Sequence, residues 1–395
     1  MGYTTTTCIT RSAFPNDKAL RLSDEVPACN ENPGGSLETL SAIEQIAIDR
    51  FCDQCLQLEP TPDYPDGGLL KRADVQNEIF NRICADHPEP LPGNARLQLR
   101  TLKELVRRIQ ASISDEEVDE YEVSDSIMNQ ICQLVLVPQV SEFELAQMKS
   151  LVTYRLSLLK SASQIYIHEN RSLIAAGGAT GHRTWEAALH LGQYLCLNRH
   201  LVECKRVLEL GAGTGYNSVL CAKHLGAAHV LASDGSEEVL ENLCDNFALN
   251  DCAYNYNSLS DTPITPKLLK WGHALMGTEE PEWNGGQPID VILGADITYD
   301  QNANPALAST LRELFDLYPD AEVILSVTDR NPETFSLFRD LCRKNQLRVA
   351  EFDFTDGEQH EQLQKLASSG QRARNLTPYY HSPAPIRLLR VSRIV

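Results

Sequence analysis

From residue 206 onward, short apolar runs alternate with amphipathic helical patterns, and this alternation limits the possible folds more than any other feature. Six runs have the length and residue types of strands: 206–210, 229–234, 290–296, 322–329, 347–354 and 385–392. Helical patterns lie between them near 216–225, 236–249, 303–318 and 333–345. The alternation predicts a mostly parallel α/β sheet with helices on both faces. The last two runs have no helix between them, so we expect them to pair antiparallel.

The preceding part of the chain has a different pattern. Residues 1–36 are rich in Thr, Asn, Pro and Gly, which predicts a loose arm. Three- and four-residue spacing of apolar side chains then predicts helices separated by Pro-rich breaks, at 37–58, 69–85, 97–113 and 127–137. An acidic run at 115–125 favours a solvated linker, and a partner-binding role stays open. Residues 164–174 are expected to be extended, and 185–197 helical. We therefore expect an arm at 1–36, a helical domain at 37–150 and an α/β domain at 151–395.

Charge and hydropathy argue against two classes of partner. The chain has 35 Lys and Arg against 54 Asp and Glu, a formal net charge of -19. Such a surface repels phosphate backbones, so we expect no nucleic-acid partner. No run of about 18 apolar residues is present, and the N-terminus lacks a basic region before an apolar stretch. We expect neither a membrane span nor a secretory signal.

The cysteines predict reduced thiols rather than disulfides or metal ligands. Twelve cysteines without a signal peptide are typical of a cytoplasmic chain. Cys52 and Cys55 form a C-x-x-C pair inside a helical pattern, with no second pair at zinc spacing. We therefore expect no metal.

The strongest chemical signal is the segment Glu209-Leu-Gly211-Ala-Gly213-Thr-Gly215, which follows a predicted strand and precedes a helix. Glycines let backbone amides approach a ligand, and the helix N-terminus is electropositive. The dinucleotide pattern G-x-G-x-x-G fails at Tyr216. G-x-G-x-G with an acid two residues before it is instead the nucleoside-binding loop of S-adenosylmethionine enzymes. Glu209 can receive a charge-assisted bond from the ligand's ammonium. An ordinary Gly-rich turn is the alternative.

Two further residues fit a nucleoside site. Asp234 ends the second strand, where a carboxylate binds ribose hydroxyls in doubly wound folds. A helix N-cap is its alternative role. Trp271 follows the region where a third strand should end, and its indole could stack on adenine or belong to the core.

Asp296 and Tyr299 follow the fourth predicted strand, and catalytic groups gather at the carboxyl ends of such strands. A carboxylate there stabilises an incoming amine beside a sulfonium and could guide the departing proton to water. For methyl transfer to a lysine, whose free pKa is about 10.4, the amine must first lose a proton. The transfer is then an in-line displacement that needs little covalent help, so positioning of the two reactants should dominate its catalysis. An N-P-P-Y motif, expected for methylation of adenine or amide nitrogens, is absent.

Two other segments allow a structural interpretation. Tyr379-Tyr380-His381 either contacts a protein substrate or packs as a loop. Arg330-Asn331-Pro332-Glu333 has the residue types of a helix start, with Glu333 in the first turn.

These motifs together resemble the family-16 group of seven-strand protein lysine methyltransferases. ATGHRTWEAAL at 179–189, then ELGAGTG, LKWG and GADITY occur in the family's order, and the resemblance covers roughly 150–395. The N-terminal helices and the residue sequences GGATGHRTWEAAL and GADITYD resemble one branch of this family in particular. That branch methylates a lysine of eukaryotic translation elongation factor 2. Ala179 stands where the family often has Thr. The long segment 272–288 leaves the placement of the third strand open.

The resemblance implies a class I S-adenosylmethionine-dependent methyltransferase (Rossmann-like) domain preceded by an all-helical domain. It implies that Asp296 and Tyr299 form a D-x-x-Y pair facing the substrate lysine, and that the cofactor contacts Trp185, Gly211, Ala212, Gly213, Asp234, Trp271 and Ala295. Glu209 and Gly215 complete the predicted cofactor set. The expected partner is a folded protein, elongation factor 2, methylated by a monomer in the cytoplasm.

Two alternatives remain at this point. A small-molecule methyltransferase needs no docking platform, so the helical domain argues against it. A non-catalytic scaffold would not need Glu209, the glycines, Asp234 and Asp296 together.

Overall fold

The computed structural model describes residues 40–85, 92–138, 140–159, 163–170, 180–252, 263–273, 275, 284, 286–354 and 377–394 of the chain. The predicted arm at 1–36 and Ala179 lie outside these residues. Residues Ser41–Val395 belong to one structural unit. The division of the chain into domains at residues 36 and 150 stays a prediction.

The first part of this unit is helical, as the apolar spacing predicts. Its elements are α1 (Ala42–Leu56), α2 (Gly67–Leu70), α3 (Ala73–Phe80) with the π-helical turn η1 (Asn81–Ala85), α4 (Pro92–Ser112), α5 (Asp125–Leu136) and α6 (Glu142–Gln147). A capping box fixes the start of α1, because Ser41 and Glu44 bond each other's backbone amides. Leu102, Leu105 and Ile109 form the buried stripe of α4. The single helix predicted at 69–85 is divided between α2 and α3, and the sequence pattern missed the short helix α6.

The acidic run lies where a linker was predicted, between α4 and α5. Most of its acidic side chains are exposed, and Glu117 pairs with Lys71 at 2.5 Å. Its possible role in partner binding stays a prediction.

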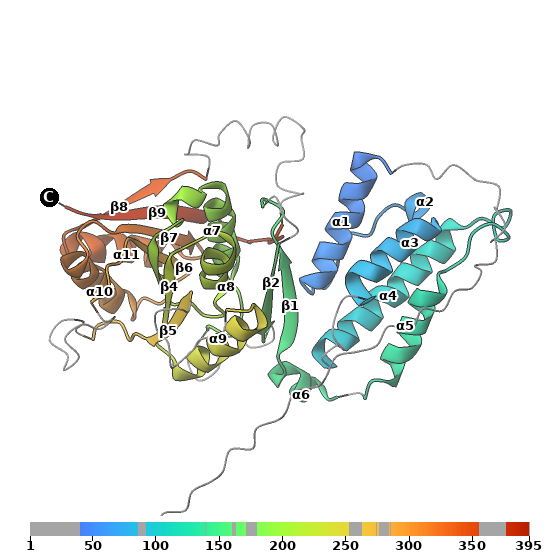
Figure 1. The fold of residues 1–395 in the computed structure, drawn as a ribbon, viewed down its shortest axis with the longest axis horizontal. Coiled ribbons are helices and arrows are strands. Elements are labelled where there is room, and N and C mark those ends of the chain that lie inside the picture. Colours follow the sequence, from blue (N-terminus) through green and yellow to red (C-terminus); the bar gives the residue numbers. More distant parts are fainter. Residues whose placement is uncertain are drawn as a thin grey trace, which may run out of the picture. The chain divides into compact units, whose positions relative to one another are not determined.

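A two-stranded antiparallel hairpin follows the helices. It consists of β1 (Ser150–Arg155) and β2 (Gln164–Glu169), and both α1 and α4 contact β1 (Figure 1). Extended structure was predicted for 164–174, and β2 confirms its first part. β1 was not predicted.

The main sheet has seven strands, β3 (Arg206–Leu210), β4 (His229–Asp234), β5 (Ile264–Leu268), β6 (Val291–Ala295), β7 (Glu322–Thr328), β8 (Leu347–Phe352) and β9 (Ile386–Arg393). Their order is β5-β4-β3-β6-β7-β9-β8, and β9 runs antiparallel to both of its neighbours. The mixed sheet with an antiparallel final pair confirms the predicted fold class. The third strand, β5, ends shortly before Trp271, as expected.

Helices cover both faces of this sheet (Figure 1). One apolar cluster includes side chains of α7 (Glu186–Leu197), α8 (Tyr216–Val219) with its continuation η3 (Leu220–His224), and α9 (Glu237–Leu249). The other includes α10 (Asn304–Leu317) and α11 (Pro332–Lys344). A single 3₁₀ turn, η2 (Arg199–Leu201), follows α7. The strand order reverses between β3 and β6, and ligands of open α/β sheets bind beyond the carboxyl ends of strands at such a point.

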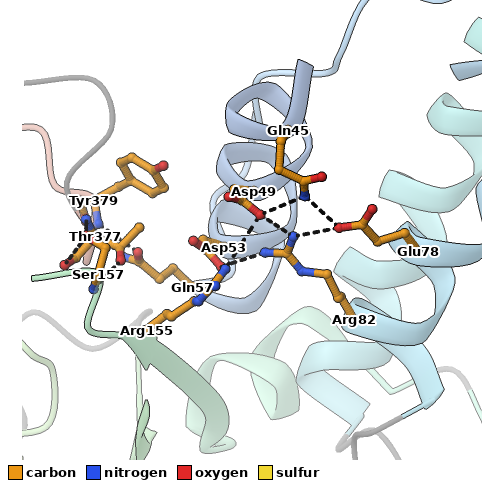
Figure 2. A network of polar contacts seen from close by, with 10 residues as sticks. All are labelled: Gln45, Asp49, Asp53, Gln57, Glu78, Arg82, Arg155, Ser157, Thr377 and Tyr379. Carbon is orange, nitrogen blue, oxygen red and sulfur yellow. Dashed lines mark hydrogen bonds and ion pairs between the residues drawn. The ribbon is translucent and has the colours of Figure 1, made fainter. Parts of the chain in front are cut away.

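Polar contacts join α1 to β1 and to the segment before β9, as Figure 2 shows. The buried Asp53 carboxylate lies 3.3 Å from Arg82 and 3.5 Å from Arg155. Burial raises the pKa of Asp53 to about 6, and the two guanidinium groups oppose that shift. The Gln57 side chain donates to the Tyr379 carbonyl at 2.7 Å and accepts from the Tyr379 amide at 2.8 Å.

The same segment also binds α7. Gln193 donates to the Pro378 carbonyl at 2.9 Å, and the Tyr380 hydroxyl lies 2.7 Å from His190 Nδ1. For Tyr379 and Tyr380 these contacts favour the packed-loop interpretation over direct contact with a substrate.

Candidate active site

A cavity of about 790 Å³ lies at the carboxyl ends of the central strands. Every residue of the predicted site except Gly215 lines it: Trp185, Glu209, Gly211, Ala212, Gly213, Asp234, Trp271, Ala295, Asp296 and Tyr299. The sequence reasoning did not single out the neighbouring Thr180, Arg183, Ser236, Lys270 and Ile297, which also line it. The sequence offered one signal for these five residues, which is that they lie near the predicted ends of strands. Many residues share that property, so it does not identify individual site residues.

The glycine loop after β3 has a backbone that side chains would obstruct. Gly211 and Gly213 have φ values of +61° and +55°, in the left-handed region. A Cβ on Gly211 would lie 2.8 Å from Cγ2 of Ile297. The Ala212 amide donates to the Ser233 carbonyl at 2.8 Å, which ties the loop to β4. The loop therefore presents bare backbone to the cavity.

Gly215 has a structural reason to be glycine. It precedes α8 with φ +83°, and a Cβ there would lie 2.6 Å from Cδ2 of Leu243 and 2.9 Å from Cε1 of Phe247. Close packing of the loop against α9 therefore requires this glycine. Its predicted contact with the cofactor stays untested.

Asp234, at the end of β4, is fixed by two backbone amides. Oδ2 accepts from Gly213 at 3.1 Å, and Oδ1 accepts from Ser236 at 3.1 Å. Burial raises the pKa of Asp234, while these amides oppose the shift. The N-cap of α9 is Ser236, whose hydroxyl accepts from Val239. The alternative role of Asp234 as the N-cap of this helix is therefore wrong.

Glu209 is a buried acid in the cavity wall. Burial raises its pKa to about 7, and the hydrogen bond that the Ser218 hydroxyl donates to the carboxylate opposes that shift. Because a buried carboxylate is poorly solvated, a cation placed beside it strongly stabilises its charged form. The ammonium of an amino-acid ligand fits this requirement.

Trp185 immediately precedes α7, and its indole lies near two arginines. Nε1 donates to the Thr180 carbonyl at 3.1 Å. The Arg183 and Arg330 guanidinium carbons lie 4.9 and 5.2 Å from the centre of the ring. Glu186 pairs with both arginines, at 2.7 and 3.3 Å. Sequence reasoning missed this arrangement, which fixes one wall of the cavity.

Trp271 both lines the cavity and packs against the core, so its two predicted roles are compatible. Its ring lies beside the glycine loop, since Cζ2 is 3.6 Å from the position of a Cβ on Gly211. The next residue, Gly272, donates its amide to Thr310 Oγ1 at 3.0 Å, which anchors the turn to α10.

Asp296 follows β6 in a left-handed conformation, with φ +53°. Its side chain accepts from the Thr328 amide at 2.9 Å and from the Thr328 hydroxyl at 3.0 Å, and it pairs with Arg330 at 2.8 Å. A non-glycine residue in this region is strained, and such residues cluster at functional sites. Asp296 is thus a buried, firmly held carboxylate.

Tyr299 lies at the mouth of the cavity. Its side chain is exposed, and its hydroxyl is 3.0 Å from Thr180 Oγ1. The two members of the D-x-x-Y pair therefore differ in environment: Asp296 is enclosed, while Tyr299 faces the entrance.

The residues that are present fit S-adenosylmethionine. The cavity volume is in the range of small-molecule sites. Gly211, Gly213 and Asp234 line the cavity together, as a nucleoside site requires. Among the described residues no cation pairs with the buried Glu209, and an amino-acid moiety would supply one.

The described residues offer neither a metal site nor a helix that could span a membrane. They contain no group of three or more His, Cys, Asp or Glu side chains that could hold a metal ion. None of the described helices has both the length and the apolar character needed to cross a bilayer.

Known proteins resemble this chain over most of its length. A family model described as lysine methyltransferase matches residues 122–344, a range that contains all the cavity-lining residues. Protein-lysine N-methyltransferase EFM3 of Chaetomium thermophilum is 48% identical over 87% of this chain and 97% of its own length. EFM3 of Saccharomyces cerevisiae is 29% identical over 71% of this chain and 79% of its own. Protein-lysine N-methyltransferase EEF2KMT of Homo sapiens is 29% identical over 70% of this chain and 77% of its own.

Proposed function

The chain belongs to the lysine methyltransferase family and is an S-adenosylmethionine-dependent protein-lysine N-methyltransferase, and we propose that its substrate is translation elongation factor 2. The choice of substrate is supported by the motif sequences GGATGHRTWEAAL and GADITYD together with the N-terminal helices. A cytoplasmic monomer is consistent with this substrate and is part of the proposal.

The observation that carries the proposed mechanism is that one cavity contains the glycine loop, Asp234 and Asp296. Asp234 would bind the ribose hydroxyls, and Trp271 would pack on the adenine. Glu209 would receive the ammonium of the cofactor's amino-acid moiety. These residues would hold the cofactor in the cavity that Asp296 also lines.

Bound S-adenosylmethionine supplies a methyl group on a cationic sulfur; its carbon–sulfur bond breaks as a carbon–nitrogen bond to lysine forms, leaving S-adenosylhomocysteine. The lysine ammonium, with a free pKa of about 10.4, loses one proton to water before it attacks. Asp296 accepts a hydrogen bond from the lysine nitrogen and so aligns its lone pair. Tyr299 at the mouth contacts the incoming side chain. Positioning of two bound reactants accounts for most of the acceleration of such a displacement.

The test is incubation of the purified chain with labelled S-adenosylmethionine and a eukaryotic extract that lacks this activity. The Asp296→Asn variant serves as the inactive control. We expect label on one protein of the size of elongation factor 2, and mass spectrometry should find a methylated lysine. Label on a different protein would reject elongation factor 2 as the substrate while leaving the enzyme class in place.

A further inference from the structure

Arg330 lies in the turn between β7 and α11, where the sequence indicated only the start of a helix. That prediction is confirmed, because Asn331 accepts a hydrogen bond from the Glu333 amide at 2.9 Å and caps α11. The Arg330 amide donates to the Thr328 carbonyl at 2.9 Å, which makes the turn tight. Neither of these contacts uses the Arg330 side chain.

The Arg330 guanidinium contacts both sides of the candidate site. Nη1 lies 2.8 Å from Asp296 Oδ2, and Nη2 lies 3.3 Å from Glu186 Oε2. The group also lies 5.2 Å from the centre of the Trp185 ring. Asp296 follows β6, whereas Trp185 and Glu186 stand at the start of α7. One side chain therefore connects the residue proposed to face the lysine with a residue predicted to contact the cofactor.

The contact determines which oxygen of Asp296 can serve the substrate. The side chain is only 6% exposed, so an ionised carboxylate there needs compensating groups. Oδ2 accepts from both Arg330 and the Thr328 hydroxyl, while Oδ1 accepts from the Thr328 amide. A carboxylate oxygen accepts about two hydrogen bonds. Counting donors among the described residues, Oδ1 is the oxygen that retains acceptor capacity.

A guanidinium suits this position better than an ammonium. Its planar fork can bond two carboxylates and stack over an aromatic ring, whereas a lysine ammonium is a point charge on a flexible stem. Arg330 is not among the described residues that line the cavity. Its effect on the reaction must therefore pass through Asp296 and Trp185.

We propose that Arg330 is a positioning residue for methyl transfer, which fixes Asp296 and Trp185 relative to each other. This inference rests on the roles proposed above for those two residues. A misplacement of about 1 Å can lower a reaction rate by about a hundredfold. Loss of Arg330 should therefore lower kcat strongly and change substrate and cofactor binding little.

The experiment measures kcat and KM for purified elongation factor 2, and the Kd for S-adenosylmethionine, in Arg330→Gln and Arg330→Lys. We expect kcat to fall about a hundredfold in Arg330→Gln, with both binding constants within about fivefold of wild type. Arg330→Lys keeps the positive charge but lacks the planar guanidinium fork, so its kcat should lie between those of Arg330→Gln and the wild type. Arg343→Gln is the matched control, because Arg343 forms an exposed ion pair with Asp340 on α11. Its kcat should equal that of the wild type.

Folding is checked by thermal unfolding of each variant. If Arg330→Gln does not fold, Glu186→Gln decides in comparison with Arg183→Gln. Both variants remove the ion pair between Arg183 and Glu186, and Glu186→Gln also removes the contact of Glu186 with Arg330 while leaving the Arg330–Asp296 pair. Glu186→Gln should then have the lower kcat of the two, with little change in binding. A wild-type kcat in the folded Arg330 variants, or a kcat in Glu186→Gln no lower than in Arg183→Gln where Arg330→Gln does not fold, would overturn the role of Arg330 alone. A wild-type chain that methylates no lysine would overturn the proposed mechanism as well.

Discussion

The Gly213 amide donates a hydrogen bond to the Asp234 carboxylate across 3.1 Å, which joins the loop after β3 to the end of β4. The two residues are 21 positions apart in the sequence, and both line the cavity. The bond holds the carboxylate beside bare glycine backbone, where a ribose would lie. It joins the glycine loop, which is the strongest chemical signal of the sequence, to Asp234.

Replacement of Asp234 by Asn should weaken cofactor binding. The amide keeps the shape but removes the charge that strengthens hydrogen bonds to ribose hydroxyls. We expect the Kd for S-adenosylmethionine, measured by calorimetry, to rise about 10- to 100-fold. Asp245→Asn, at an exposed site on α9, is the control. Unchanged affinity in Asp234→Asn would remove this residue from the ribose site.

Replacement of Asp296 by Asn should abolish transfer while the cofactor still binds. The amide cannot form the ion pair with Arg330 or accept from the lysine nitrogen as a charged group. We expect kcat to fall about a hundredfold or more, with the Kd for S-adenosylmethionine close to that of the wild type. Asp320→Asn, in an exposed turn, controls for loss of charge. Turnover at the wild-type rate would reject the proposed role of Asp296.

Cofactor affinity should rise with pH as Glu209 ionises. Its pKa in the folded chain is about 7, because burial raises it from 4.5. Only the ionised form attracts the ligand's ammonium, so binding should weaken by up to about tenfold per pH unit below this pKa. Calorimetry between about pH 5.5 and 7.5 avoids titration of an α-amino group, whose pKa is about 7.7 to 8.0. An equally steep pH dependence in Glu209→Gln would contradict the assignment.

The same pKa shift has an opposite effect on the unliganded protein. The folded state holds the Glu209 proton up to a higher pH than the unfolded state does. The stability that this group contributes is therefore complete below pH 4.5 and is lost as the pH rises through about 7. Denaturant unfolding of wild type and Glu209→Gln over this range isolates the contribution, because the variant lacks the titrating group.

Replacement of Gly215 by Ala should destabilise the fold. The left-handed backbone and the contacts of a Cβ with Leu243 and Phe247 both oppose a side chain. We expect a loss of about 1 to 3 kcal/mol in the free energy of unfolding. Gly235→Ala is the matched control, since the nearest atom to its Cβ would lie 3.7 Å away. Equal stability of the two variants would show that the loop relaxes.

Replacement of Gln57 by Ala should weaken the connection between α1 and the segment before β9, which is drawn in Figure 2. The change leaves two backbone groups of Tyr379 without their Gln57 partner. We expect about 1 to 2 kcal/mol of destabilisation in denaturant unfolding. Gln133→Ala, on the exposed face of α5, should have no measurable effect. A stable Gln57→Ala variant would show that water replaces the lost bonds.

Sequence patterns predicted long elements well because each depends on neighbours within a few residues. The βαβ alternation gave the class of the sheet, and the apolar run 347–354 gave β8. The patterns missed β1 and α6, which are both short. Equally short strands such as β3 and β6 were found because they alternate with helices. A six-residue element outside such an alternation contains too few periods to distinguish a strand, a helix and a loop.

The sequence by itself determined the βαβ framework, the glycine loop and the carboxylates at the ends of β4 and β6, because local residue order specifies these features. Only the tertiary structure decided which residues that are distant in the sequence contact each other. Arg330 lies 34 positions from Asp296, and Tyr299 lies 119 positions from Thr180. Gln57 and Tyr379 are 322 positions apart. Such contacts depend on the paths of the intervening chain and on the packing of several elements, and no periodicity within one segment contains that information.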